Sequence, residues 1–420
     1  MKIVIVPDNH LNKNVYSGVK DKKIPSLPFR NVDFMNSFEY IVDKCIQELH
    51  PDLFIIPGDV YDHPSPSNEV RGFFSSQLCK LSEAKIPVII LLGNHDVFKK
   101  NHALEDIHKL GLKNVKVIER PQIKMFRGFR LLLFPYSMDV EQKIVTMKEE
   151  FNNFIEEIEK NDSEAESLFF GHFGVKDAIM NEYSISSDLA TDTTTTLPPE
   201  VEKKKFVNRN PNDITAKDLD RIGASYVFLG DFHRFQVLNT KKCIALYPGS
   251  IEKTDFNEID QKKGFVLFDT EAEPEDNMGK CRFIEYPNCR PMIQLKGDFE
   301  KIKSDFAKVD YSKHQEAMVK ISFIGTSEEL GTFSTEIESF KKEIRKAVNP
   351  IHIISGQKIK DDKQDEEASR LEQQILEKGH MQAEDVIEVV KEIIIERVVD
   401  EKERQAIIDL GIEIYKENME

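Results

Sequence analysis

The sequence has few cysteines, and their spacing fits neither a disulfide framework nor a zinc framework. Its 420 residues include five cysteines, at positions 45, 79, 243, 281 and 289, without a Cys-x-x-Cys pair. An odd number of scattered cysteines is typical of reduced thiols in the cytoplasm. We therefore expect a cytoplasmic location, and we expect any metal ion to be held by oxygen and imidazole ligands.

Long apolar segments are also missing. No apolar stretch approaches the roughly 20 residues that are needed to span a bilayer. Asp8 interrupts the first apolar run too early for a signal peptide. The sequence therefore predicts a protein without a membrane segment.

The third absence is an excess of positive charge. A net charge of −16 argues against a free-standing duplex-binding protein, because neutralising phosphates requires clustered Lys and Arg. Residues 365–420 alone contain 17 acidic and 7 basic residues, so most of the acidity belongs to the C-terminal segment. Bound divalent metals would offset part of the charge that remains.

The first 270 residues alternate between strand-like and helix-like patterns. Apolar runs of strand length occur at 2–6, 53–57, 87–92, 131–134, 167–170, 226–229 and 243–247. Helical patterns lie between them, near 34–49, 68–84, 102–110, 141–160 and 215–221. This alternation predicts a layered α/β domain over residues 1–270.

The remaining sequence predicts three further parts. Residues 280–355 follow a strand, helix, strand, helix, strand pattern, which indicates a small α+β domain. Residues 356–367 are polar and charged, as a linker would be. Residues 368–420 contain two amphipathic helical patterns, which could fold back on the body as a cap. We favour a docking element for a partner protein. Residues 184–214 have no periodicity and indicate a long loop.

Five polar clusters each follow a strand-like run of the first domain. They are Asp8-x-His10, Gly58-Asp59, Gly93-Asn94-His95-Asp96, Gly171-His172 and Gly230-Asp231-Phe232-His233. Open α/β sheets build their sites on loops at the carboxyl ends of strands. Carboxylate, amide and imidazole donors together suit manganese, iron or zinc better than calcium. Each cluster alone is weak, but all five in order predict a two-metal phosphoester hydrolase.

Individual residues within these clusters suit different roles. Asp8 and His10 are two residues apart at a strand end, so on an extended chain both would reach one ion. Asp59 follows a glycine that allows a sharp turn, and its two oxygens could bridge ions roughly 3.5–4 Å apart. His95 is the best candidate for an acid that is not a ligand, and Asp96 would orient it and raise its pKa. Asp62 is expected to support the loop.

These residues resemble the calcineurin-like metallophosphoesterases and, within them, the SbcD-type nuclease subunits of SbcCD recombination nucleases. The five clusters and Asp62 carry the superfamily pattern. The narrower resemblance rests on Pro51-Asp52, Pro66-Ser67, Tyr247-Pro248-Gly249-Ser250, Phe256-x-Glu258 and Lys263-Gly264-Phe265. It covers about residues 1–270 and elsewhere concerns layout alone. The implied fold is a layered β-sandwich core flanked by helices, with a small α+β capping domain over DNA and a helical tail.

The resemblance also implies a ligand set and a mechanism. One metal would be held by Asp8, His10, Asp59 and His233, and the other by Asp59, Asn94, His172 and Asp231. Manganese is the expected ion, with magnesium as an alternative. His95 would assist the leaving oxygen, and no covalent enzyme intermediate is required.

The implied function is that of a DNA nuclease working in repair, recombination or replication. It would act as an exonuclease on duplex ends and as an endonuclease on single strands and hairpins. Helices near 68–84 and 102–110 would form a homodimer. The C-terminal helices would bind an SbcC-type, SMC-like ATPase.

Position 231 departs from the family pattern, which usually has a histidine there. Aspartate is a competent ligand, but a weak or absent second metal is the alternative. Two other functions stay open: a stand-alone phosphodiesterase for nucleotides or other small substrates, and a catalytically silent scaffold. The capping layout and acidic tail argue against the phosphodiesterase. The intact ligand residues argue against the scaffold.

Overall fold

The computed structural model describes residues 1–13, 19–161, 163–176, 178, 213–274 and 276–359. These residues fall into two compact units. The first comprises Met1–Leu295, Lys303–Ile321 and Glu338–Gly356, and the second comprises Lys296–Ile302, Ser322–Ile337 and the described part of Gln357–Glu420. Within the described ranges, no helix is both long and apolar enough to cross a membrane.

The first unit contains two six-stranded sheets. The first sheet has the order β14 (Cys281–Glu285), β13 (Gly264–Asp269), β1 (Lys2–Ile5), β2 (Leu53–Pro57), β3 (Val88–Leu91) and β6 (Val115–Ile118). Its β1, β2, β3 and β6 are parallel, whereas β13 runs antiparallel to β1, and β14 runs antiparallel to β13. The carboxyl ends of the parallel strands therefore lie along one edge of the sheet.

The second sheet repeats this arrangement. Its order is β11 (Gln236–Val237), β12 (Ile244–Tyr247), β10 (Tyr226–Gly230), β9 (Ser167–His172), β8 (Phe129–Phe134) and β7 (Gln122–Phe126). The four central strands are parallel, and the short outer strands β11 and β7 are antiparallel. Parallel strands of this kind are buried on both faces and need helices to cover them.

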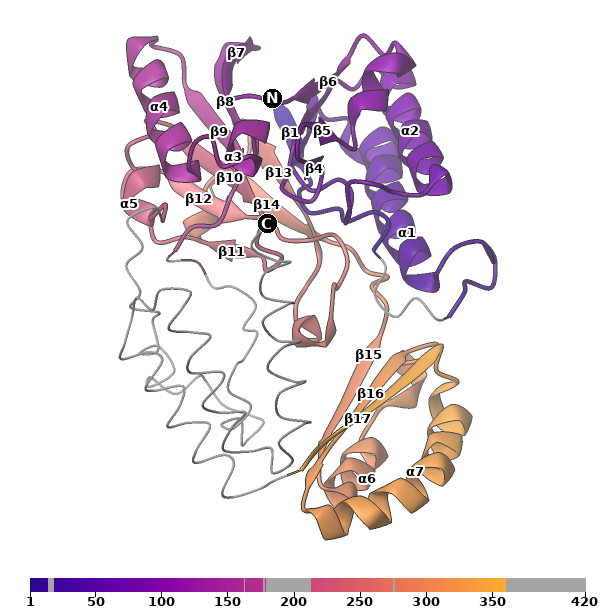
Figure 1. Cartoon of the computed structure of the whole chain (residues 1–420). Coiled ribbons are helices and arrows are strands. Elements are labelled where there is room, and N and C mark those ends of the chain that lie inside the picture. The colour runs from indigo at the N-terminus through magenta and orange to yellow at the C-terminus, as the bar shows by residue number, and fades with distance from the viewer. Residues whose placement is uncertain (14–18, 162, 177, 179–212, 275, 360–420) are drawn as a thin grey trace, which may run out of the picture. The chain divides into compact units, whose positions relative to one another are not determined.

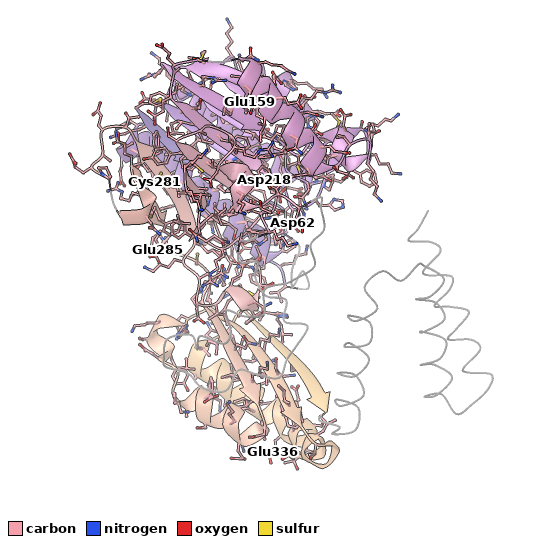
Figure 2. The ribbon with its side chains drawn as sticks, turned by 90° about the vertical axis from the view of Figure 1, so that its left-hand side faces the viewer. Asp62, Glu159, Asp218, Cys281, Glu285 and Glu336 are labelled. Atoms are coloured by element: carbon pink, nitrogen blue, oxygen red, sulfur yellow. The ribbon has the colours of Figure 1, made fainter. Side chains whose placement is uncertain are left out.

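The two sheets pack face to face, and helices cover their outer faces (Figure 1). Helices α1 (Phe29–Lys44) and α2 (Asn68–Glu83) lie on the first sheet, and α3 (Met138–Glu141), α4 (Met147–Lys160) and α5 (Ala216–Leu219) accompany the second. Figure 2 labels Glu159 on α4 and Asp218 on α5, and Asp218 forms an ion pair with Lys148 of α4. A π-helical turn, Cys45–Leu49, extends α1.

The alternation of side chains in β1 explains this layering. Ile3 and Ile5 are fully buried in the cluster between the two sheets. Val4 points the other way, into the cluster that contains Phe38 of α1 and Phe74 of α2. Successive residues of a strand face opposite sides, so a continuous apolar run fits a strand that is covered on both faces.

A small three-stranded sheet follows, with the order β15 (Met292–Gly297), β16 (Met318–Gly325) and β17 (His352–Ile359). Helices α6 (Phe299–Ala307) and α7 (Ser327–Val348) connect its strands. In the first unit, Phe306 packs on Phe340 with ring centroids 5.4 Å apart. In the second unit, Phe323 stacks on Phe333 at 4.6 Å.

The predicted fold class is confirmed: a layered α/β core with helices on its outer faces, followed by a small sheet whose strands are connected by two helices. The helix predicted near 102–110 is present only in part and as a 3-10 helix. Its first residues form strand β5 (Asn101–His102), which pairs with β4 (Val97–Phe98), and only a 3-10 helix, Glu105–Leu110, follows. The strand that was expected to end at 355 continues to Ile359, into the predicted linker. Most of the predicted 184–214 loop and all of 368–420 lie outside the described residues.

Candidate metal centre

All five polar clusters lie at the carboxyl ends of parallel strands. The clusters after β1, β2 and β3 belong to the first sheet, and those of β9 and β10 belong to the second. The sheets meet at this edge, where the Nδ1 of His172 donates to the carbonyl of Pro57 at 2.9 Å. This edge collects the predicted site residues from five separate segments of the chain.

Asp8 and His10 have a backbone conformation that the sequence did not predict. β1 ends at Ile5, and both residues have a left-handed backbone, with φ of 51° and 41°. The expectation of an extended chain carrying both side chains was therefore wrong. Left-handed conformations cost about 1–3 kcal/mol each outside glycine and cluster at functional sites. Both residues are fully buried.

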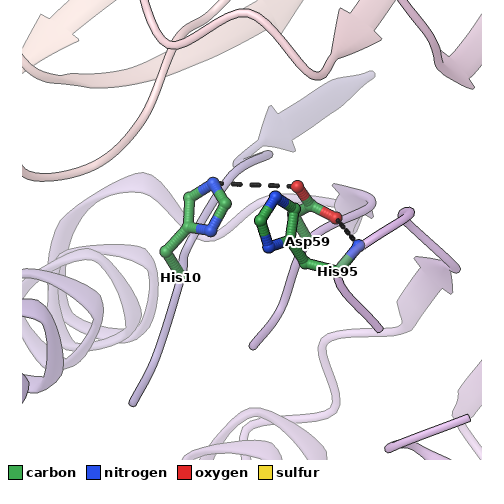
Figure 3. A group of neighbouring side chains, drawn as sticks. All are labelled: His10, Asp59 and His95. Carbon is green, nitrogen blue, oxygen red and sulfur yellow. Dashed lines mark hydrogen bonds and ion pairs between the residues drawn. The ribbon is translucent and has the colours of Figure 1, made fainter. Parts of the chain in front are cut away.

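Asp59 lies at the centre of the cluster, as Figure 3 shows. One carboxylate oxygen, Oδ2, is 3.7 Å from the Nε2 of His10. The other, Oδ1, is 3.3 Å from the Nε2 of His172 and accepts the backbone N–H of His95 at 3.0 Å. The two oxygens thus face different imidazoles, which is the arrangement a bridging carboxylate requires.

Two glycines make room for this centre. Gly58 has a φ of +90°, and a Cβ there would lie 2.1 Å from the Nδ1 of His172. A Cβ at Gly93 would lie 2.1 Å from the Oδ1 of Asp59. Neither position can accept a side chain without displacing a site residue.

His172 and Asn94 form the second side of the centre. The Nε2 of His172 is 2.9 Å from the Oδ1 of Asn94. Because the Nδ1 of His172 donates to the Pro57 carbonyl, its Nε2 is the atom available to a metal. Imidazole nitrogen, amide oxygen and carboxylate oxygen therefore converge on one point.

His233 lies on the side of His10. The Nε2 atoms of the two rings are 2.9 Å apart, and the rings meet edge to face with centroids 4.7 Å apart. The Nδ1 of His233 lies 3.3 Å from both the Oγ1 of Thr254 and the Oε1 of Glu258. The ring therefore turns Nε2 inward and Nδ1 toward the surrounding protein.

His95 and Asp96 are placed differently from their predicted pairing. The Nδ1 of His95 donates to the backbone carbonyl of Asp62 at 2.9 Å. Asp96 instead accepts the backbone N–H groups of Val60, Tyr61 and Gly93, at 3.3, 3.0 and 3.0 Å. Asp96 therefore holds the loops that carry Asp59 and Asn94 and does not serve as the partner of the His95 ring.

Asp231 contributes through its backbone. Its N–H donates to the Oδ1 of Asp8 at 2.9 Å, and its φ of 105° is strained for a non-glycine residue. Its Oδ2 faces Gly174, where a Cβ would come within 3.0 Å. The role of its carboxylate as a ligand stays a prediction.

Two groups of three donors among the described residues have ligand atoms within 4.8 Å of one another. One group is His10, Asp59 and His95, and the other is Asp8, Asp59 and His172. Asp59 belongs to both groups, and its bridging role stays a prediction. The first group includes His95, which was predicted as an acid, and the second includes Asp8, which was predicted for the other ion.

Burial and mutual contact shift the pKa values of these groups in opposite directions. Burial raises the pKa of Asp8 to about 6 and lowers the pKa of His10 to about 4. Burial also opposes ionisation of Asp59, but His172 beside it holds the pKa of Asp59 well below its usual range. Asp59 in turn raises the pKa of His172 to about 10, against the effect of burial. Without a metal, a proton on His172 balances the buried carboxylates.

The donor set fits divalent metal ions. The Oδ2 of Asp8 is buried and has no hydrogen-bond partner among the described residues. An unsatisfied buried carboxylate oxygen is costly, and a cation would satisfy it. A metal at His172 would replace the proton that holds its Nε2 against Asn94 and Asp59.

Several neighbouring residues had no predicted role in the metal centre. Asp62 was expected only to support the loop, and it does so by lying 3.2 Å from the Nδ1 of His10 and 2.6 Å from the Nζ of Lys13. Thr254, Glu258 and Lys263 surround His233. The resemblance pointed to Glu258 and Lys263 without a role, and nothing distinguishes them in a segment that is rich in charged residues.

Comparison with known proteins identifies the class of this chain. A family model described as calcineurin-like phosphoesterase matches residues 1–235. The chain therefore belongs to the calcineurin-like phosphoesterases, as its fold and its clustered donors indicate.

Among individual proteins, the chain is similar to a subunit of the nuclease SbcCD of Staphylococcus epidermidis. The two are 25% identical over 328 residues, which cover 74% of this chain and 76% of that protein. It is also 34% identical over 103 residues to the DNA double-strand break repair protein Mre11 of Sulfurisphaera tokodaii, a match that covers 24% of each protein. A solved dimetal phosphatase from Danio rerio covers 64% of this chain, and 91% of its own chain, at 10% identity with a TM-score of 0.36. A TM-score this low supports no statement about function.

Proposed function

We propose that this chain is the nuclease subunit of a DNA repair or recombination complex and hydrolyses phosphodiester bonds with two manganese ions. One observation carries the proposal: Asp59 directs its two oxygens toward different imidazoles and belongs to both groups of close donors. The similarity to an SbcCD nuclease subunit over 74% of the chain supports DNA as the substrate. A cytoplasmic location is part of the proposal.

The residues that would hold the ions are those collected at the sheet edge. The proposed ligands are Asp8, His10, Asp59 and His233 for one ion, and Asp59, Asn94, His172 and Asp231 for the other. Mixed oxygen and nitrogen donors favour manganese, with magnesium as the alternative. When bound, two such ions supply Lewis-acid polarisation of phosphate oxygens and lower the pKa of a water molecule.

His95 is the proposed catalytic acid. Its Nδ1–H is occupied by the carbonyl of Asp62, so the ring is fixed and Nε2 is left for the substrate. The backbone N–H of His95 is also anchored, on the Oδ1 of Asp59. A proton on Nε2 would pass to the leaving oxygen of the phosphodiester. Asp96 acts as a positioning residue, because it holds the loops on both sides of Asp59.

The proposed partners extend beyond the metal centre. An SMC-like ATPase would bind the C-terminal segment 368–420, and a second copy would pair through α2 and the segment near 102–110. Residues 365–420 are acidic and would repel the phosphates of DNA. We therefore propose that DNA binds to another part of the chain. Both duplex and single-stranded DNA are proposed substrates.

The test replaces His95 with Asn, which removes the proton donor and keeps a polar side chain. We expect kcat for linear duplex DNA and for bis-p-nitrophenyl phosphate to fall by about 10²- to 10⁴-fold. Manganese affinity, measured by calorimetry, should stay within about threefold. The matched control is His63→Asn, because His63 is exposed and bonds locally to the N–H of Ser65.

Three outcomes would contradict parts of the proposal. Full cleavage by the His95→Asn variant would remove the role of His95. Hydrolysis of the small diester but not of DNA, even with the ATPase present, would indicate a stand-alone phosphodiesterase. Failure to hydrolyse either substrate in manganese would indicate a silent scaffold.

A further inference from the structure

A buried ion pair lies directly behind His233. The Nζ of Lys263 is 2.8 Å from the Oε2 of Glu258, and both side chains are fully buried. Glu258 belongs to a short 3-10 helix, Phe256–Glu258, and Lys263 immediately precedes β13. Removing two charges from water is costly, and an apolar pair of similar volume is often equally stable. Stability alone therefore does not explain why a charged pair is buried at this position.

Glu258 is bonded on both carboxylate oxygens. Its Oε2 accepts the backbone N–H of Thr254 at 2.7 Å, and its Oε1 accepts the hydroxyl of Thr254 at 2.7 Å. The same Oε1 lies 3.3 Å from the Nδ1 of His233. These bonds fix the carboxylate in one orientation, with one oxygen facing the imidazole.

Lys263 holds the backbone of the same histidine. Its Nζ donates to the carbonyl oxygen of His233 at 2.8 Å, and to the Oγ of Ser250 and the Oε1 of Gln261 at 2.9 and 3.0 Å. Glu258 thus contacts the ring of His233, while Lys263 contacts its main chain. The ion pair links the two contacts into one rigid unit.

This arrangement decides which nitrogen of His233 carries the proton. The ionised Glu258, paired with Lys263, can only accept a hydrogen bond. The hydroxyl of Thr254 already gives its proton to Glu258, so toward His233 it can also only accept. The Nδ1 of His233 must therefore be the donor. Its Nε2 points away from Glu258 and lies 2.9 Å from the Nε2 of His10, on the side of the metal centre.

We propose that the Glu258–Lys263 ion pair is a positioning device that fixes the tautomer and orientation of His233 for a divalent metal. The inference rests on the proposed function, because it takes His233 as a metal ligand. A carboxylate behind a metal-binding histidine makes that histidine a better ligand and typically contributes about 10- to 100-fold in metal affinity. Lys263 holds that carboxylate in place through the ion pair at 2.8 Å.

The experiment compares manganese binding by the metal-free full-length chain before and after Glu258→Gln. We expect calorimetry to show affinity weakened by about 10- to 100-fold. We also expect excess manganese to restore kcat for bis-p-nitrophenyl phosphate to within about threefold of wild type. A purely structural role would instead lower kcat at every manganese concentration.

The matched control is Glu252→Gln. Glu252 is a buried glutamate of the same segment, but its carboxylate accepts the backbone N–H groups of Lys253 and Arg290, away from the ring of His233. We expect this variant to alter thermal stability while leaving manganese affinity within about threefold. An equal loss of affinity in both variants would overturn the proposal.

A second variant covers the possibility that Glu258→Gln unfolds because it leaves Lys263 unpaired. The double variant Glu258→Gln with Lys263→Met removes both charges and keeps the volume. It should fold, as circular dichroism would show, and still bind manganese weakly. Wild-type affinity in either folded variant, or failure of both to fold, would overturn the proposal. A wild-type chain that binds manganese but cleaves no diester would instead overturn the proposed function alone.

Discussion

The two sheets contribute to the metal centre in different ways. The loops of the first sheet support one another through the backbone. The N–H of Asp8 donates to the carbonyl of Gly58 at 3.2 Å, and the N–H of His10 donates to that of Asp59 at 3.1 Å. Asp96 adds three further bonds to backbone N–H groups of the same loops. The strained residues of this half are held by the main chain around them.

In the second sheet, partners bond to the outer nitrogens of the imidazole rings. His172 is oriented by a carbonyl of the opposite sheet, that of Pro57. His233 is oriented by Glu258, whose charge depends on Lys263. The comparison shows that the two sheets support their proposed ligands differently. Left-handed backbone places Asp8 and His10 in the first sheet, whereas His172 and His233 are held through the outer nitrogens of their rings.

The largest expected effect comes from the residue shared by both groups of donors. Asp59→Asn removes the charge that faces His10 and His172. We expect kcat/KM for duplex DNA to fall by about 10³-fold or more, because metal ions contribute several kcal/mol of transition-state stabilisation. Nuclease assays in manganese measure this.

The control for that change is Asp43→Asn on α1, where Asp43 pairs with Lys80 and belongs to neither group of donors. It should leave kcat/KM unchanged. If Asp59→Asn retained more than a tenth of wild-type activity, the two halves would not share a bridging ligand. The two sheets would then not contribute to one shared metal centre.

An intermediate effect on stability and manganese binding is expected at Gly58, a residue of the first sheet's loops that lies against His172 of the second sheet. Gly58→Ala places a Cβ against the Nδ1 of His172 at a backbone with φ of +90°. We expect the free energy of unfolding to fall by about 1–3 kcal/mol from backbone strain, with weaker manganese binding because His172 must move. Denaturant titration and calorimetry measure the two effects.

Gly72→Ala is expected to change the free energy of unfolding in the opposite direction. Gly72 lies inside α2 with open space around it, so alanine should stabilise the helix by roughly 0.5–1 kcal/mol. Manganese affinity should not change. Equal destabilisation by both substitutions would show that crowding against His172 is not the cause.

The smallest effect is expected at Asp231. Asp231→Asn keeps the backbone N–H that donates to Asp8 and removes only the side-chain charge. Because that carboxylate belongs to neither close group of donors among the described residues, we expect manganese affinity to fall by about tenfold or less. Calorimetry should still report two ions. If Asp231→Asn weakened manganese binding as much as Asp59→Asn does in the same calorimetric measurement, Asp231 would be an essential ligand.

Much of the fold was predictable because it depends on local patterns. The apolar runs at 53–57 and 226–229 became β2 and β10 almost without change. Strands buried on both faces form continuous apolar segments, which are easy to recognise. The helix predicted near 102–110 begins only at Glu105, as a 3-10 helix, because the chain just before it turns back on itself as β4 and β5.

The site was predictable in composition but not in detail. Its residue types, and their positions after strands, followed from the sequence. The left-handed backbone of Asp8 and His10 did not, because Asp and His tolerate that conformation without a sequence mark such as glycine. The role of Asp96 was also hidden, since three backbone N–H groups are partners that no motif displays.

The sequence by itself determined the α/β layering, the order of the five clusters and the oxygen and imidazole chemistry of the centre. These depend on residue type and on spacing along the chain. Only the tertiary structure decided which atoms face one another: Asp59 between two imidazoles, Asp96 on the loops, and Glu258 with Lys263 behind His233. The physical reason is that hydrogen-bond direction and burial arise where segments far apart in the chain meet.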